Sequence, residues 1–227
     1  MFMILFSKSE KRVNNYNIMN EKCNNLIEKF EAVDSINHFD EVAQKCTKDG
    51  VCDWSFINSP NNQSTGPGKV GCLASHIYLL KQIKENNYYN CDWFVIFEDD
   101  VTIFDNFVET LKSKIPTFEK LNTNFVKLFT DTKDENNKKR QFWHKRIVEK
   151  NIYKMRPQFH TLAAMINRKG IDYILSQLPI NVNIDLWFTH EHINNLNAVY
   201  WHNNLITNGG ALNYKGKNWN LGSLICS

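Results

Sequence analysis

Strand-like and helix-like patterns alternate along the chain. Short apolar runs of strand length occupy residues 1–6, 30–33, 93–97, 125–129, 160–166 and 198–202. Stretches with helical periodicity or a polar, surface-helix character lie between them, at residues 10–26, 71–87, 106–114, 168–178 and 185–195. Alternating strands and helices with strongly apolar strands are typical of a mostly parallel sheet covered on both faces. The pattern therefore predicts an α/β fold with a mostly parallel central sheet flanked by helices.

The clearest helix is GCLASHIYLLKQIKENN, residues 71–87. Its apolar residues Leu73, Ile77 and Leu80 recur at helical spacing, and His76 shares their face. A His in this position is commonly a hydrogen-bonded core residue. The preceding residues 47–69 are rich in Asn, Ser, Pro and Gly and predict a long loop, and loops of that length are often functional.

Three consecutive acids end the most apolar strand pattern. In WFVIFEDDV, Glu98, Asp99 and Asp100 follow five apolar residues directly. Ligands of α/β sheets bind beyond the carboxyl ends of the strands, and carboxylates are ligands for Mg²⁺ and Mn²⁺. Clustered acids repel one another unless a cation is present. The alternative is that the two aspartates open the next helix, because acids favour helix N-termini. The pattern alone leaves both interpretations open.

Composition narrows the class of protein. The chain has 227 residues, of which 42% are hydrophobic and 22% charged, and its net charge of +3 is too small to indicate nucleic-acid binding. Six cysteines occur without C-x-x-C spacing, which argues against a zinc ribbon or a thioredoxin motif. No signal peptide or membrane-spanning run is apparent. We expect one domain over residues 1–227, soluble and cytoplasmic, with reduced cysteines.

Several motifs together resemble one enzyme family. FEAVD at 30–34, GCLASH at 71–76 and FEDDV at 97–101 occur in the order and approximate spacing of glycosyltransferase family 25, the lipooligosaccharide galactosyltransferase and collagen β-galactosyltransferase group. AAMINRKG at 163–170 and IDL at 184–186 continue the resemblance. It covers residues 1 to about 190, whereas the region around WHNN at 201–204 departs from the pattern.

The resemblance implies a GT-A-like fold and an inverting transfer of a hexose, galactose or glucose, from a UDP-sugar. Residues 1–130 would bind the nucleotide, and residues 131–227 would form the acceptor side. Mn²⁺ or Mg²⁺ would be held by Asp100, Glu98 and His202. The donor would contact Ser7, Lys8, Arg12, Asp34, His76, Glu98 and Asp99. The acceptor would be a glycan or a hydroxylated protein.

The base that takes the acceptor proton is assigned to Asp185, which resembles the late Asp of the family. The alternative role of Asp185 is a helix N-cap, and the two roles are compatible. Thr189-His190-Glu191-His192 lacks the spacing of a zinc motif. Trp187, Trp201 and Trp219 are either sugar-stacking residues or core.

Two other functions remain possible from the sequence. One is a glycosyltransferase-like domain that has lost activity and serves as a binding or scaffold module. The other is a metal-dependent phosphohydrolase or nucleotidyltransferase that uses the same acids.

Overall fold

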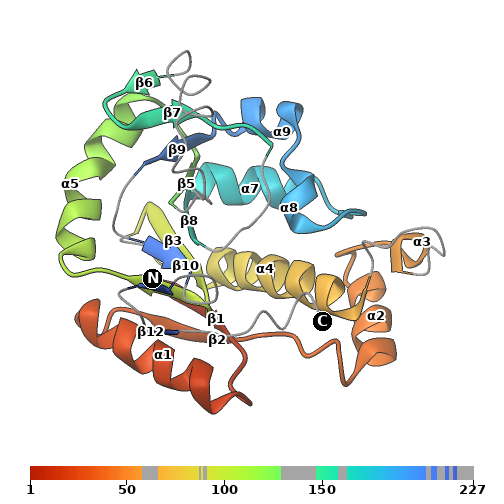
Figure 1. The fold of residues 1–227 in the computed structure, drawn as a ribbon. Coiled ribbons are helices and arrows are strands. Elements are labelled where there is room, and N and C mark those ends of the chain that lie inside the picture. Colours follow the sequence, from red (N-terminus) through yellow and green to blue (C-terminus); the bar gives the residue numbers. More distant parts are fainter. Residues whose placement is uncertain are drawn as a thin grey trace.

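A mixed eight-stranded sheet forms the centre of the computed structural model (Figure 1). The structure describes residues 1–57, 66–86, 88, 91–128, 147–157, 163–202, 206–208, 213–214 and 217–218. In spatial order the strands are β2 (Glu28–Glu31), β1 (Phe2–Leu5), β3 (Trp93–Glu98), β8 (Ala163–Asn167), β5 (Phe125–Lys127), β9 (Val199–Trp201), β7 (Ile152–Lys154) and β6 (Ile147–Glu149).

The strand directions confirm the α/β class and show a more mixed sheet than the alternating pattern predicts. β1 pairs in parallel with β2 and β3, and β5 pairs in parallel with β9. β8 lies between β3 and β5 and is antiparallel to both. β3, β5 and β9 therefore point the same way, and their carboxyl ends share one edge of the sheet with those of β1 and β2.

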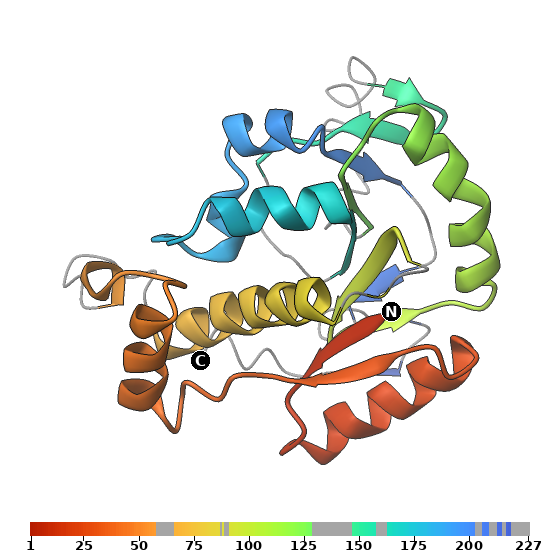
Figure 2. The same ribbon diagram turned by 180° about the vertical axis from the view of Figure 1, so that it is seen from behind.

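Helices cover both faces of this sheet (Figures 1 and 2). α4 (Pro67–Glu85) and α7 (Arg168–Ser176) lie side by side on one face, and α1 (Glu10–Lys22) and α5 (Phe107–Lys120) lie on the other. The shorter helices are α2 (Phe39–Lys48), α3 (Trp54–Ile57), α8 (Ile184–Trp187) and α9 (His190–Asn195). They flank the α4 and α7 side.

The sheet separates two hydrophobic cores, one on each face, and alternate residues of its central strands belong to each core. Phe2 and Ile4 of β1 pack with α4 and α7, whereas Met3 and Leu5 pack with α1 and α5. Successive strand residues point to opposite faces, so a central strand that is covered on both sides must be apolar at every position. This explains the continuous apolar run that precedes Glu98.

Most predicted elements are confirmed within a few residues, and several were missed. The predictions missed α2, β4 (Val101–Ile103), β6, β7 and three short late strands, β10 (Ile206–Asn208), β11 (Asn213–Tyr214) and β12 (Lys217–Asn218). The loop prediction for 47–69 is wrong at α3 and at the start of α4, and residues 58–65 lie outside the described part. The strand predicted at 160–166 is observed as β8, and its first three residues also lie outside that part.

The helix predicted over 185–195 is two helices. Phe188 ends α8 with a non-helical backbone, and the Thr189 hydroxyl then caps α9 by accepting a hydrogen bond from the His192 backbone N–H.

In the described part of the chain, no helix is both long enough and apolar enough to cross a bilayer. Cys23, Cys46, Cys52, Cys72 and Cys91 form no disulfide within that part, and Cys226 lies outside it.

Candidate active site

A cavity of about 260 Å³ opens where β1, β2 and β3 end. Its walls come from the ends of β1 and β2 and the residues that follow them, the first turns of α4, and the acids at the end of β3. Glu98, Asp99 and Asp100 all line it, and each is buried. The acids therefore occupy the edge of the sheet where α/β proteins bind ligands, as the strand pattern predicts.

Asp99 anchors the acid turn to the protein. One carboxylate oxygen of Asp99 accepts a hydrogen bond of 2.8 Å from the Phe6 backbone N–H, and the other forms a buried ion pair with Arg12. Asn15 of α1 holds the same turn, because its side-chain amide donates to the carbonyls of Asp99 and Val101. Both Asp99 oxygens are thus committed to the fold.

Asp100 has the opposite character. Its Oδ1 is fully buried and has no hydrogen-bond partner among the described residues. Burial, reinforced by the neighbouring charge of Glu98, raises the pKa of Asp100 to about 6, although Arg12 opposes the shift. A buried carboxylate oxygen without a donor is destabilising, and a hard divalent cation would satisfy it. The donor set therefore fits a bound metal ion.

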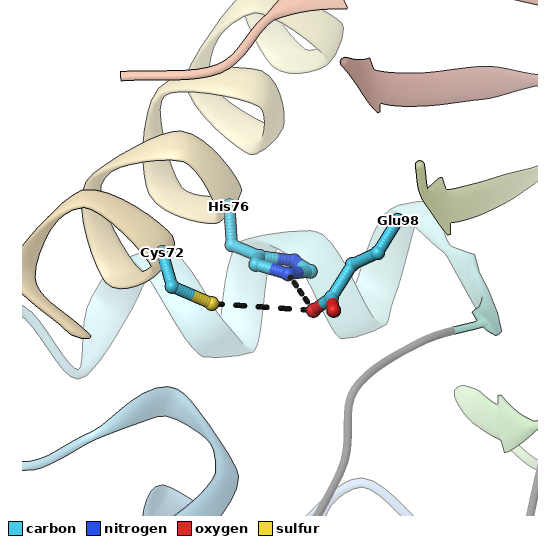
Figure 3. A group of neighbouring side chains, drawn as sticks. All are labelled: Cys72, His76 and Glu98. Carbon is cyan, nitrogen blue, oxygen red and sulfur yellow. Dashed lines mark hydrogen bonds and ion pairs between the residues drawn. The ribbon is translucent and has the colours of Figure 1, made fainter. Parts of the chain in front are cut away.

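Glu98 lies close to two side chains of α4. Glu98 Oε1 lies 3.1 Å from His76 Nε2 and 3.9 Å from Cys72 Sγ (Figure 3). Cys72 and His76 stand one helical turn apart on α4, so both side chains project from the same helix face toward the end of β3. His76 is consequently both a buried, hydrogen-bonded residue and a lining residue of the cavity.

Two other residues of the GCLASH segment, Gly71 and Ser75, allow α4 to pack closely against residues 33–35. A Cβ on Gly71 would lie 2.7 Å from the Val33 carbonyl oxygen and would also clash with Ser35 Oγ. Ser75 Oγ accepts a hydrogen bond from the Val33 N–H at 2.9 Å and donates to the Gly71 carbonyl. Gly71 and Ser75 therefore fix the helix against the 33–35 segment and hold Cys72 and His76 in place.

The residues predicted to hold the nucleotide surround the same edge. Lys8 Nζ and Asp34 Oδ2 form an ion pair of 2.6 Å, and the Ser7 N–H donates to Glu31. Hydrogen bonds from Asn37, and then from Lys8, hold the pKa of Asp34 well below its usual range. Asp34 and Arg12 line the cavity directly, whereas Ser7 and Lys8 are not among its lining residues.

Asp185 lies in the first turn of α8, outside the cavity wall. The N-cap of that helix is Asn183, so the capping alternative for Asp185 is wrong. Asp185 Oδ1 is a second buried carboxylate oxygen without a hydrogen-bond partner among the described residues.

Lys127 is a site residue that the sequence analysis missed. It ends β5 and is 4% exposed. Burial lowers the pKa of Lys127 to about 8, and the nearby charges of Asp185 and Glu98 oppose that shift. Lys127 and Ile96 are both paired with Ala164, so Lys127 projects from the α4 face of the sheet, as Glu98 does. The signal in the sequence was a lysine inside the apolar run FVKLF.

His202 follows β9, which is three strands away from β3 in the sheet. That separation is about 14 Å at the usual strand spacing. His202 Nδ1 lies 2.8 Å from the Tyr200 hydroxyl, and His202 is not among the residues that line the cavity. Its assignment as a metal ligand stays a prediction.

The remaining aromatic and His candidates belong to packing. His192 stacks on Trp187 with ring centroids 4.0 Å apart and reaches the Tyr173 hydroxyl. Trp187 and Trp201 are buried in the two cores, so their core alternative is confirmed; Trp219 lies outside the described residues. Thr189, His190 and Glu191 are exposed, as expected of surface residues.

The fold and the acid-lined cavity are those expected of an α/β transferase. The sequence model of glycosyltransferase family 25 (LPS biosynthesis protein) matches residues 1–188. The chain belongs to this family and is therefore a glycosyltransferase. This confirms the resemblance drawn from residues 30–34, 71–76 and 97–101. A search of curated proteins found no match.

Proposed function

We propose that this glycosyltransferase moves a hexose, galactose or glucose, from a UDP-sugar to a hydroxyl of a glycan or protein acceptor, with inversion and with Mn²⁺ or Mg²⁺. The observation that carries the proposal is Asp100, which lines the cavity and whose buried Oδ1 has no hydrogen-bond partner among the described residues. We also propose that the arrangement is of the GT-A type, because the acids end a central strand of a helix-flanked α/β sheet at the edge that carries the cavity.

Asp100 and Glu98 would hold the cation, and His202 is the third candidate ligand. When bound, the cation would offset the negative charge that develops on the departing diphosphate. Asp99 and Arg12 position the acid turn, and their mutual ion pair keeps Asp100 at the cavity wall. The donor would extend past Asp34 toward Lys8 and Ser7.

Asp185 would take the proton of the acceptor hydroxyl. Its unpartnered buried oxygen suits a general base, because an oxygen that already accepted a strong hydrogen bond would be a weaker base. Lys127 lies near both Asp185 and Glu98 and carries the positive charge that balances these two carboxylates. Glu98 on the donor side and the proposed base Asp185 would thus both lie near the buried ammonium group of Lys127.

The first test is thermal stabilisation by UDP-, GDP-, CMP- and TDP-sugars, each with Mn²⁺ and with a chelator. A ligand that binds only the folded state raises the melting temperature by mass action. A Mn²⁺-dependent shift with UDP-sugars alone is expected. No shift with any donor in a well-folded sample would refute donor binding and favour an inactive binding module. A donor that is hydrolysed or exchanged without any sugar acceptor would point instead to nucleotide chemistry.

A further inference from the structure

Cys72, His76 and Glu98 form a cluster (Figure 3), and Glu98 is the one member that is also a proposed ligand of the transferase cation. Their sulfur, nitrogen and oxygen donor atoms all lie within 4.8 Å of one another. The sulfur is the informative member, because hard cations such as Mg²⁺ and Mn²⁺ take oxygen ligands and thiolates select softer metals. The sulfur therefore distinguishes this cluster from the position at Asp100, whose proposed ligands offer oxygen and nitrogen only.

We propose that Cys72 Sγ, His76 Nε2 and Glu98 Oε1 form a binding site for a thiophilic divalent cation of the Zn²⁺ class. The site is separate in chemistry from the Mn²⁺ or Mg²⁺ position at Asp100. Binding would replace the Cys72 thiol proton, which leaves to solvent, and would use the neutral form of His76.

The two separations to Glu98 match such an ion. Zinc bonds of about 2.0 to 2.3 Å in a tetrahedral site place nitrogen and oxygen ligands about 3.3 Å apart, and sulfur and oxygen ligands about 3.6 Å apart. The corresponding separations here are 3.1 Å from His76 Nε2 to Glu98 Oε1 and 3.9 Å from Cys72 Sγ to Glu98 Oε1. Cys72 Sγ and His76 Nε2 lie within 4.8 Å of each other, and rotation of these side chains about an ion would bring them closer.

The three ligands also stand on rigid supports. Cys72 and His76 belong to the middle of a 19-residue helix, and Glu98 is the last residue of a central strand. Gly71 and Ser75 fasten that helix beside the strand, as described above. All three ligands line the cavity, so the fourth position of a tetrahedral ion would face the cavity and remain open to water or a ligand oxygen.

The test is a titration of tag-free, reduced protein with Co²⁺, a spectroscopic substitute for Zn²⁺. A saturable sulfur-to-cobalt charge-transfer band is expected, and Zn²⁺ should displace it. Cys72→Ser should lose the band, and His76→Gln should weaken Co²⁺ binding at least tenfold. The matched control is Cys91→Ser, which alters an exposed thiol and should leave the band unchanged.

Asp100→Asn separates this site from the proposed donor site. That variant should keep the cobalt band even where Mn²⁺-dependent donor binding is lost. Although both proposals use Glu98, this result distinguishes the failure of one from the failure of the other. Should Cys72→Ser not fold, ¹¹³Cd NMR of the unaltered protein replaces it, because the chemical shift reports how many thiolates bind. A single-thiolate shift supports the proposal. An absent band, a band that persists in folded Cys72→Ser, or a shift for no thiolate or for two would overturn it.

Discussion

Asp100→Asn is expected to stabilise the ligand-free protein while it removes metal-dependent donor binding. Burial and the charge of Glu98 raise the pKa of Asp100 from 3.8 to about 6. A rise of roughly 2 units, at about 1.4 kcal/mol each, corresponds to about 3 kcal/mol against the ionised side chain in the folded state at neutral pH. Asn has nearly the same shape and no charge, so the substitution removes up to that amount of destabilisation.

The sign of this effect sets its pH dependence. The folded pKa is the higher one, so the folded protein binds more protons than the unfolded chain between about pH 4 and pH 6. The destabilisation by Asp100 is therefore complete above pH 6 and disappears toward pH 4. The stability difference between the variant and the unaltered protein should shrink over the same interval.

Thermal melts with and without ligand measure both effects. For a chain of this length about 1 kcal/mol shifts the melting temperature by roughly 2–4 °C, so ligand-free Asp100→Asn should melt up to about 6–12 °C higher at pH 7. Mn²⁺ with UDP-sugar should raise the melting temperature of the unaltered protein alone and so narrow the difference, because only the unaltered protein would gain from the ligand. Asp92→Asn makes the same charge change at an exposed position and serves as the control. A destabilised Asp100→Asn, or one stabilised by Mn²⁺ and donor as strongly as the unaltered protein, would refute the reasoning.

Three further outcomes follow from the site. Asp185→Asn should bind donor normally and lose transfer by a hundredfold or more, measured as UDP release with acceptor; normal transfer would remove Asp185 as the base. Lys127→Met should lower transfer at least tenfold, and transfer by the unaltered enzyme should fall as pH rises through about 8, where Lys127 loses its proton; a flat profile above pH 8 would contradict this role. Gly71→Ala should destabilise the fold by about 1–3 kcal/mol in denaturant melts, because its Cβ would meet the Val33 carbonyl. The control Gly66→Ala has open space around its Cβ, so an equal loss there would argue against the close-docking explanation.

An unpartnered, destabilising acid in a buried position is itself informative. Asp100 and Asp185 each hold a buried carboxylate oxygen without a partner among the described residues, whereas Asp99, between Glu98 and Asp100 in sequence, is fully engaged. The pattern of apolar and acidic residues by itself does not distinguish the three acids of 98–100, and the family resemblance supplied the roles expected of them. Their different roles follow from the side chains that reach each one, above all Arg12 from α1.

Local patterns were sufficient where the determinant is local. Helical spacing marked α4, continuous apolar runs marked β1 and β3, and the position of the acids after a central strand placed the site at one edge of the sheet. The motifs at 71–76 and 97–101 also indicated the family correctly. The local pattern was misleading at 185–195. One continuous helical periodicity there covers two helices, which are separated by the backbone turn at Phe188 and Thr189.

The sequence by itself thus determined the α/β class, the buried strand that ends in acids, and the family. The tertiary structure decided which side chains share the site. Lys127 is brought near Glu98 and Asp185 by strand order, since β8 runs antiparallel between β3 and β5 and aligns their carboxyl ends. Cys72 and His76 meet Glu98 because α4 docks closely at Gly71. The periodicity of apolar residues indicates which face of a helix or strand is buried. It does not indicate contacts between residues distant in sequence, because those are determined by how the elements pack.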